Sequence, residues 1–397
     1  MSIESNQQSR RPRRLRLGMV GGGPGAFIGA VHRIAARLDD RYELVAGALS
    51  SDAQKARTGA ADVGIATERA YASFSEMAVA EAQRPDGIDV VAIVTPNHLH
   101  YAPAKAFLDT GIHVICDKPL TTTVEDALDL AAIVRRTGLI FGVTHTYSGY
   151  PMVRQARAMV AAGELGPLRV IQVEYAQDWL TTALEKTGQK QAEWRTDPAR
   201  SGAGGCLGDI GTHAFHLARF VSGLKCNELA ADISTFVPGR RVDDNVQVML
   251  RFAGGARGML WASQVAPGNE NRVSLRIYGE KAGLTWEQEN PNYLLLTPLG
   301  ESPRLISRGG VAATAVAAHA TRVPAGHPEG YLEAFAQLYT DLAEQMHAHR
   351  EKRASDPASR WVPGIGDGVE GMQFIDAVLE SSQRNAAWVK GPLVDVF

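Results

Sequence analysis

Short apolar runs alternate with amphipathic segments through the first third of the chain. The amphipathic segments are about three helical turns long, and glycine, proline or a polar residue ends most runs. Buried strands that alternate with helices of this length indicate parallel βαβ units and, because such crossovers are right-handed, a doubly wound sheet. The predicted strands are residues 15–20, 42–49, 89–94, 113–116 and 139–143, and the predicted helices are residues 28–38, 102–108 and 124–136.

The pattern changes after Tyr150, where a predicted helix over residues 153–162 precedes a series of strand-like segments. Glycine, proline and asparagine separate these segments, and several of them alternate polar with apolar residues. This is typical of an antiparallel sheet that is covered on one face. Residues 302–325 are rich in Gly, Ala and Thr and are predicted to be a loop, either a lid or a subunit arm. The predicted strands are residues 168–175, 246–252, 258–265, 273–278 and 293–296, and two later helices, residues 331–347 and 371–382, are expected to pack back on the body.

A chain of 397 residues with 45% hydrophobic residues has the length and composition of two globular domains. We therefore predict an α/β protein with a doubly wound parallel sheet in the N-terminal domain. The C-terminal α/β domain is predicted to hold an open, mostly antiparallel sheet. The predicted divisions are a disordered basic tail at 1–14, a dinucleotide-binding domain at 15–147, and a substrate-binding and oligomerisation domain at 148–397.

Charge and cysteine content restrict the function classes. The net charge of -2 gives no reason to expect a nucleic-acid partner or an anionic membrane surface. Arginines crowd residues 10–16, but we reject a twin-arginine export signal because glycines interrupt the apolar stretch that follows and no small-residue cleavage site is present. No apolar run approaches the ~18 residues of a membrane helix.

The three cysteines are widely spaced, which favours a reducing, cytoplasmic location without a disulfide framework or a zinc site.

A glycine-rich turn follows the first predicted strand and opens the first predicted helix. A dinucleotide-binding domain needs glycines there for a tight turn and for close approach of the backbone to a pyrophosphate at the helix N-terminus. Gly21 and Gly23 match the first two glycines of the fingerprint and Ala26 matches the third. We therefore predict an NAD or NADP site, the alternative being a glycine-rich turn without a ligand. The candidate cofactor contacts in this turn are Gly21, Gly23, Gly25, Phe27 and Ile28.

The residues after the second predicted strand bear on the choice between NAD and NADP. A carboxylate roughly 20 residues beyond the glycines usually binds the ribose hydroxyls of NAD. Ser50 stands at the expected position, followed by Ser51, Asp52, Lys55 and Arg57. Without that carboxylate nothing repels a 2′-phosphate, and Lys55 or Arg57 can bind one, whereas Asp52 still allows NAD. Both cofactors stay open, with Ser50, Ser51 and Arg57 as candidate contacts.

The sequence Thr95-Pro-Asn-His-Leu-His100 follows the third predicted strand, at the carboxyl edge where ligands bind in such sheets. Asn97 carries an amide that can hold the cofactor, and Thr95, Pro96 and His100 are further candidate contacts. For the histidines at positions 98 and 100 we favour ordinary capping or surface positions over a role in cofactor binding.

Lys118 lies in Cys116-Asp-Lys-Pro119, which follows the next predicted strand at the same edge. Removing a hydride from an alcohol carbon requires loss of the hydroxyl proton, and the reverse reaction requires a polarised carbonyl. A lysine can donate to that oxygen, and partial burial lowers the pKa of a lysine toward the working range. Lys118 is therefore a candidate catalytic residue, the alternative being an ordinary surface lysine.

Asp209 and His213 follow a run of glycines and are four residues apart. We expect a helix from Asp209, which would put both side chains on one face. A carboxylate beside an imidazole orients it and raises its pKa toward the working pH, which describes a general acid/base pair. The alternatives are a helix cap with a surface histidine, or half of a metal site, for which no third strong ligand is evident. His216 lies on the same face and either binds substrate or packs.

Together these motifs resemble the Gfo/Idh/MocA family, named for glucose–fructose oxidoreductase, inositol dehydrogenase and a rhizopine catabolism protein. The resemblance extends from about Leu15 to Val389 and includes the glycine turn, residues 95–100, Lys118-Pro119, the Asp209 segment and Asp243-Asp244. It implies a Rossmann domain followed by an α/β domain whose open sheet packs against another subunit. A homodimer or homotetramer is therefore expected.

The resemblance also implies residue roles. Lys118 and His213 would be the catalytic residues, with Asp209 supporting them in the substrate pocket. Residues 96–97 would line the nicotinamide side, and Asp117, a further candidate cofactor contact, stands where the family more often has Glu. Ser50 and the extra glycines around Pro24 depart from the family pattern, and Ser50 is more similar to the NADP-using branch.

Several residues are candidate substrate contacts in addition to Lys118, Asp209 and His213. Aromatic side chains suit the apolar faces of sugar rings and polar groups suit their hydroxyls, although each of these residues is equally typical of a core or surface position. No arginine cluster indicates a phosphate or nucleotide group, which favours a free sugar, a glycoside or an inositol. The further candidates are His145, Tyr147, Trp179, Trp194, Arg195 and His327.

The leading hypothesis is an NAD(P)-dependent dehydrogenase acting on a secondary alcohol or ketone carbon. A redox-neutral glycosidase, which oxidises one ring carbon, eliminates and regenerates the cofactor, is an alternative that the sequence does not separate. A non-catalytic NAD(P)-binding sensor is a third, but a sensor needs no proton-transfer groups such as Lys118 and His213.

Overall fold

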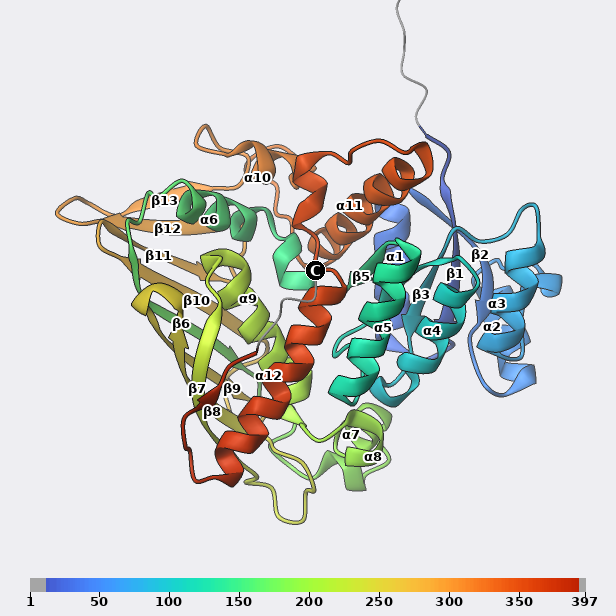
Figure 1. The fold of residues 1–397 in the computed structure, drawn as a ribbon, viewed down its shortest axis with the longest axis horizontal. Coiled ribbons are helices and arrows are strands. Elements are labelled where there is room, and N and C mark those ends of the chain that lie inside the picture. The colour runs from blue at the N-terminus through green and yellow to red at the C-terminus, as the bar shows by residue number, and fades with distance from the viewer. Residues whose placement is uncertain (1–11, 393–397) are drawn as a thin grey trace, which may run out of the picture.

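Two sheets dominate the computed structural model, which describes residues 12–392 (Figure 1). The first sheet is parallel, with strand order β2-β1-β3-β4-β5. The order reverses beside β1, so the sheet is doubly wound, as predicted. Its strands are β1 (Leu15–Gly21), β2 (Tyr42–Ala48), β3 (Val90–Val94), β4 (His113–Cys116) and β5 (Phe141–Val143).

Helices cover both faces of the parallel sheet because its central strands are apolar on both sides. On one face, α1 (Phe27–Leu38) and α11 (Tyr331–Glu351) share a core with alternate residues of β3. On the other face, α4 (Tyr101–Asp109) and α5 (Val124–Thr137) pack against the remaining residues of β3. The carboxyl ends of the strands stay open to the second domain.

The second sheet is mostly antiparallel, with strand order β13-β12-β11-β10-β6-β9-β8-β7-β14. The central pair, β6 and β9, is parallel. The predicted open, mostly antiparallel sheet is confirmed. Its strands are β6 (Leu168–Ala176), β7 (Cys226–Ser234), β8 (Asn245–Phe252), β9 (Arg257–Ser263), β10 (Arg272–Gly279), β11 (Ala282–Glu287), β12 (Tyr293–Pro298), β13 (Arg304–Ser307) and β14 (Val389–Lys390).

Helices pack on one face of the second sheet. α6 (Pro151–Ala161), α9 (Thr212–Ser222) and α12 (Ile365–Gln383) contribute to the core beneath it. Along β8, Val248 is buried on that side while its neighbour Met249 is exposed on the other. The period-two pattern in the sequence therefore reflects one covered face and one open face.

Some elements fall where the sequence pattern gave no prediction. α2 (Ala53–Asp62) and α3 (Phe74–Gln83) bury only a few small or medium side chains, so their apolar stripes are weak. The prediction of a loop over residues 302–325 is wrong in two places, because β13 and α10 (Ala315–His319) lie there. β13 extends the sheet edge through backbone pairing with β12, and its side chains carry no strong apolar pattern.

The last long helices tie the two domains together. α11 contributes Phe335 and Tyr339 to the core of the parallel sheet, although it follows β13 of the second sheet in the chain. Arg322, just before α11, pairs with Asp39 at the end of α1. α12 packs against both α5 and β7. These contacts therefore join the two domains at several places.

The N-terminal arginines are only partly within the described residues. Residues 1–11 of the expected tail lie outside them. Arg13 forms a bidentate pair with Asp89, and Arg14 pairs with Asp40. None of the helices within residues 12–392 combines the length and apolar character that crossing a bilayer requires.

Candidate active site

A cavity of about 560 Å³ lies between the carboxyl edge of the parallel sheet and the second sheet. This volume is typical of small-molecule sites, which span about 300–1,000 Å³. Both domains contribute side chains to it. They include Lys118 after β4, Tyr175 on β6, His213 on α9 and Tyr331 on α11.

The turn between β1 and α1 has the backbone conformation expected of a dinucleotide site. Gly21, Gly22 and Gly25 adopt φ angles of 80°, 70° and 80°, which favour glycine. A Cβ on Gly29 would lie 2.4 Å from the Gly22 Cα, so Gly29 makes the close helix–strand approach. The assignment of Ala26 to the third fingerprint glycine is therefore wrong. The longer turn moves that position to Gly29, and Ala26 is the N-cap of α1.

The N-terminus of α1 is open to an anion. Its N-cap, Ala26, supplies no capping side chain, and a Cβ on Gly25 would meet no atom of residues 12–392 within 4 Å. Backbone N–H groups and the helix dipole favour an anion at such a terminus. Phe27, which is 67% exposed, and Ile28 line the cavity beside it. These residues fit the pyrophosphate of a dinucleotide.

The residues predicted to determine the preference for NAD or NADP follow the end of β2. The Ser50 hydroxyl accepts a hydrogen bond from the Asp52 N–H at 3.1 Å. The Asp52 carboxylate caps α2 by accepting from the Lys55 N–H at 2.9 Å. Ser51 and Arg57 are exposed. The helix-capping Asp52 and the exposed cations Lys55 and Arg57 therefore follow closely in sequence after Ser50, the position where the ribose carboxylate is usually found.

The turn after β3 brings two predicted cofactor contacts to the cavity. Thr95 and Asn97 line it, and Pro96 is the N-cap of the short 3₁₀ turn that carries Asn97. The Asn97 side chain donates to the Ser201 carbonyl at 2.8 Å, which joins this turn to the second domain.

His100 has a structural environment. It is fully buried, and its two ring nitrogens lie 2.9 Å from the Thr95 and Pro119 carbonyl oxygens. These bonds connect the turns after β3 and β4, and His100 is not among the residues that line the cavity. His98 is exposed, in keeping with the surface interpretation.

Asp117 anchors the segment that carries Lys118. Its carboxylate accepts from the Thr144 hydroxyl at 2.6 Å and lies 3.0 Å from the His32 Nε2. The other His32 nitrogen lies 2.7 Å from the Tyr339 hydroxyl on α11. Burial acts to raise the pKa of Asp117, but the His32 ring and the Thr144 hydroxyl outweigh it and hold that pKa below its ordinary value. The end of β4 is thus fixed from three elements.

Lys118 is paired with Asp209 across the domain boundary. Its Nζ donates to the Asp209 backbone carbonyl and, at 3.1 Å, to the Asp209 Oδ1. The other carboxylate oxygen accepts from Arg195 at 3.3 Å and from Gln264 at 2.9 Å. Burial acts to raise the pKa of Asp209, but Lys118, Arg195 and Gln264 hold it well below its usual range. Asp209 is therefore a charged anchor for the lysine.

The predicted acid/base pair of Asp209 and His213 is not formed. Both residues line the cavity, but the carboxylate is occupied by Lys118, Arg195 and Gln264, and no hydrogen bond within residues 12–392 joins it to the imidazole. Cationic donors outcompete a neutral ring for a carboxylate. Burial and then the Lys118 charge lower the pKa of His213 well below its ordinary value, whereas the spacing of Asp209 and His213 predicted a raised pKa.

Asp209 lies in a π-helical turn, Leu207–Gly211, rather than at a helix cap. The buried Asp243 carboxylate accepts from the Gly205 and Leu207 N–H groups at 2.6 and 2.7 Å, which holds the start of this turn. π-turns interrupt the regular helix and are frequent at functional sites. Here the turn presents both the backbone carbonyl and the carboxylate of Asp209 to Lys118.

His213 is enclosed by aromatic rings. The Tyr147 and His145 rings meet it edge-on, with centroids 5.0 and 5.5 Å away. The Tyr147 hydroxyl donates to the Tyr175 hydroxyl at 2.6 Å, so both tyrosines are fixed. The His213 Nδ1 is buried and has no hydrogen-bond partner in the described chain. Nε2 is therefore the ring nitrogen available to the cavity.

Two family models match the chain, one for each domain. Residues 15–145 match an oxidoreductase family with an NAD-binding Rossmann fold, and residues 153–285 match the GFO/IDH/MocA C-terminal domain. The Bacillus subtilis uncharacterized oxidoreductase YfiI is 34% identical over 95% of this chain and 96% of its own length. The chain belongs to the Gfo/Idh/MocA family.

Solved structures agree over nearly the whole length. An oxidoreductase from Sinorhizobium meliloti is 52% identical, with a TM-score of 0.87 over 96% of this chain and 100% of that one. An inositol dehydrogenase homolog from Azotobacter vinelandii, solved with NADH and myo-inositol, is 34% identical, with a TM-score of 0.88 over 95% of this chain and 98% of that one. This Gfo/Idh/MocA protein therefore has an NAD-binding Rossmann domain.

The predicted substrate contacts of this Gfo/Idh/MocA protein divide into two groups. Tyr147, Trp194 and Arg195 line the cavity. His145 does not line it and instead lies behind His213. His327 is exposed, and its carbonyl oxygen accepts from Arg308, so it is not brought to this cavity. Its place next to a proline and a helix start gave no information on distance from the site.

Other lining residues were missed by the sequence analysis. They come from the ends of β6, β10 and β11 and from the start of α11, and no local motif marks them. Only sheet pairing places these segments together, because β10 and β6 are neighbours in space but far apart in sequence. These residues are Tyr175, Gln177, Glu270, Asn271, Gln288 and Tyr331.

The site places a positively charged side chain and a neutral base in the same cavity. Lys118 can donate to a substrate oxygen and His213 can accept a proton. Within the described residues, no group of three His, Cys, Asp or Glu side chains is placed to hold a metal ion.

Proposed function

We propose that this protein is an NAD(P)-dependent dehydrogenase that transfers hydride to or from a secondary alcohol or ketone carbon of a neutral, hydroxyl-rich ring. The observation that carries the proposal is the placement of Lys118 and His213 on one cavity, from the two domains. The open N-terminus of α1 adjoins the same cavity through Phe27 and Ile28. Hydride transfer needs a polarised oxygen and a proton acceptor beside a dinucleotide.

Lys118 binds and polarises the reacting oxygen. Its ammonium group is held by Asp209, so the donor is oriented before substrate arrives. In the oxidation direction the His213 Nε2 accepts the hydroxyl proton, while Lys118 stabilises the negative charge that develops on the oxygen. Bound NAD(P) supplies the hydride acceptor. In the reduction direction His213 returns the proton to the carbonyl oxygen.

The cavity lining favours a neutral polyol. Amide side chains both donate and accept hydrogen bonds, which matches hydroxyl groups, and indole faces suit the apolar face of a ring. Arg195 is already paired with Asp209, and Glu270 adds negative charge, so an anionic substrate would meet repulsion. The Azotobacter vinelandii relative that holds NADH and myo-inositol makes an inositol the first substrate to test. The amides and indoles are those of Gln177, Gln191, Asn271, Gln288, Trp179 and Trp194.

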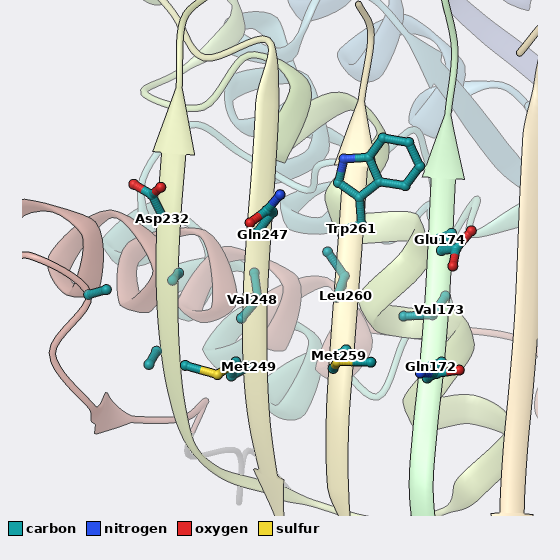
Figure 2. A pocket seen from close by; sticks show the side chains of 13 residues that line it. Gln172, Val173, Glu174, Asp232, Gln247, Val248, Met249, Met259, Leu260 and Trp261 are labelled. Atoms are coloured by element: carbon teal, nitrogen blue, oxygen red, sulfur yellow. The ribbon is translucent and has the colours of Figure 1, made fainter. Parts of the chain in front are cut away.

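The proposal includes self-association through the open face of the second sheet. Figure 2 shows Met249, Met259 and Trp261 on neighbouring strands of that face, between Asp232 and Glu174. The two methionines are directly paired across β8 and β9, and each is 52% exposed. An apolar centre with a polar rim is the usual anatomy of a protein interface. A second copy is the occupant we propose, because an isologous contact pairs this face with itself.

The test is absorbance at the reduced-nicotinamide band with a panel of inositols, hexoses and glycosides, each with NAD and with NADP. We expect reduction with at least one neutral polyol, and the preferred cofactor reports which groups at the end of β2 bind the ribose. Reduction of nicotinamide with none of the panel, together with no oxidation of the reduced cofactor by the matching ketones, would contradict the proposal.

A further inference from the structure

Three histidine rings form a buried cluster behind the candidate active site. His145 and His216 are stacked, with centroids 4.2 Å apart and planes inclined by 7°. His145 meets His213 edge-on at 5.5 Å. Of the three, His213 alone lines the cavity, so the other two lie on its far side. The cluster joins the end of β5 to α9.

The cluster contains buried ring nitrogens without a hydrogen-bond partner in the described chain. They are the Nδ1 atoms of His145 and His213 and the Nε2 of His216. The His216 Nε2 forms no hydrogen bond but lies within ion-pair distance of Asp367, whereas the two Nδ1 atoms have no polar partner in the described chain. Leaving a buried polar atom unpaired is unfavourable, so these two Nδ1 atoms need an explanation. Nitrogens that pass a proton must be free to exchange partners. Because imidazole N–H bonds lie in the ring plane, the stacked His145 and His216 rings share no hydrogen bond, and a proton passes between them only when one ring rotates.

The cluster ends at a carboxylate that reaches solvent. The His216 Nε2 lies 3.4 Å from the Asp367 Oδ1, and the Asp367 side chain is 35% exposed. The other Asp367 oxygen accepts from the Gly364 N–H at 2.8 Å, so the residue also caps α12. Burial acts to raise the pKa of Asp367, but His216 and the Gly364 N–H outweigh it and keep that pKa well below its usual value. Asp367 is therefore an ionised acceptor at the surface end.

The charged groups around the cluster favour proton movement away from the cavity. Lys118 faces His213 and His145 from the cavity side and disfavours a positive charge on either ring. Burial and the neighbouring His216 hold the pKa of His145 well below its ordinary value, and the negative charge of Asp367 acts in the opposite direction.

Other groups near Asp367 complete this environment. Arg157 from α6 and Arg219 from α9 lie close to Asp367. Arg219 is itself paired with Glu370, and Arg157 lies over the Phe220 ring, so neither replaces His216 as the partner of the Asp367 Oδ1.

We propose that His213, His145, His216 and Asp367 form a path that carries the substrate proton from the active site to solvent, an inference that rests on the proposed dehydrogenase function. Oxidation breaks the C–H and O–H bonds of one alcohol carbon and forms a carbonyl. The hydride reduces the nicotinamide. The hydroxyl proton goes to the His213 Nε2, a proton leaves the His213 Nδ1 toward His145, and one is released from Asp367 to water. The rear path matters because cofactor and substrate fill the cavity during the reaction.

Two substitutions break the path while keeping its packing. Asp367→Asn keeps an oxygen for the Gly364 N–H but removes the carboxylate. His216→Phe keeps a ring stacked on His145 but removes the nitrogens. Asp376→Asn, at an exposed position on the same helix, is the matched control. We expect both path variants to lower kcat for alcohol oxidation by about tenfold or more, with little change in KM and a larger solvent deuterium effect on kcat.

Formate should partly restore kcat in Asp367→Asn, because a small carboxylate can reach this partly exposed position, and it should not restore His216→Phe. A merely structural role would not produce this rescue. Wild-type kcat and an unchanged solvent isotope effect in both path variants would overturn the path and leave the dehydrogenase function intact.

A second readout does not depend on turnover. In protein carrying ¹⁵N-labelled histidine and bound NAD, the His213 ring signals should change in Asp367→Asn and His216→Phe but not in Asp376→Asn. Identical His213 signals in all variants would overturn the path. An inactive wild type would overturn the dehydrogenase proposal alone, since the ring signals still report whether these side chains share a proton.

Discussion

At the scale of single residues, the candidate site separates a fixed positive charge from a neutral base. Lys118 is oriented by Asp209, while burial and the nearby Lys118 charge keep the pKa of His213 low. A neutral imidazole accepts a proton without first losing one. In the proposed reaction the adjacent cation would stabilise the alkoxide that forms, so each residue would assist the step that the other performs.

Replacing Lys118 with Met should remove the oxygen-polarising donor. We expect kcat/KM to fall by about 10²–10³-fold, the usual loss when a charged donor to the reacting oxygen is removed. Arg195 and Gln264 still hold Asp209, so the variant should fold and bind cofactor nearly as well as the wild type. Steady-state kinetics and fluorescence titration with NADH measure the two effects. Lys105→Met, at an exposed position on α4, is the control, and activity within threefold of wild type in Lys118→Met would contradict the assignment.

The identity of the third glycine can be tested at Gly29 and Ala26. A methyl group on Gly29 would overlap the Gly22 Cα, and overpacking of this kind costs about 1–3 kcal/mol. Gly29→Ala should therefore lower the midpoint of thermal unfolding by several degrees and weaken NAD binding. Ala26→Gly should change both quantities little. The opposite ranking would restore Ala26 as the close-packing position.

At the scale of elements, the π-turn Leu207–Gly211 depends on a buried carboxyl group in a different segment. Asp243 precedes β8 and accepts two backbone N–H groups at the start of the turn. Burial, which outweighs these hydrogen bonds, raises the pKa of Asp243 to about 6. The position of Asp209 is therefore coupled to a group that titrates near neutral pH.

Asp243 should make stability fall as pH rises. Its folded pKa of about 6 lies above the ordinary 3.8, so its stabilising contribution is complete below that ordinary value and is lost as pH rises through about 6. The size is on the order of 3 kcal/mol. Urea unfolding of the wild type and Asp243→Asn at several pH values should show a free-energy difference that favours the wild type more at pH ~4.5 than at pH ~7. A difference independent of pH would contradict the raised pKa.

At the scale of the whole molecule, the two faces of the second sheet differ. The covered face packs on α6, α9 and α12, and α9 carries His213. The open face presents Met249 and Met259 to solvent in the single chain (Figure 2). Association through this face would stiffen the sheet whose ends line the cavity.

Met259→Glu should dissociate the proposed assembly. A carboxylate at the centre of the open face would be buried without a partner against a second copy, which is strongly unfavourable. Light scattering after size-exclusion chromatography should show a multimer for the wild type and a monomer for Met259→Glu. Val79→Glu, at an exposed position on α3, should leave the wild-type mass unchanged. A monomeric wild type would overturn self-association through the sheet.

The sequence by itself determined the features that depend on local order. Period-two and helical patterns predicted the parallel sheet and most strands of the open sheet, since strands and amphipathic helices bury one face or both in a regular way. The glycine turn, Lys118, Asp209 and His213 were identified as candidates because each of them lies in a short sequence motif. The helices α2 and α3 and the strands β7, β11, β13 and β14 were missed. Of these, α2, α3 and β13 are weakly patterned, because neighbouring elements hold them more than their own apolar stripes do.

Only the tertiary structure decided which groups pair. Asp209 and His213 are separated by about one helical turn in sequence. Asp209 nevertheless binds Lys118, Arg195 and Gln264, because charge and hydrogen-bond geometry outweigh sequence proximity. The helix–strand contact that moves the third glycine to Gly29 likewise exists only between packed elements. Burial and neighbouring charge also set the pKa of His213, and both arise when distant segments meet.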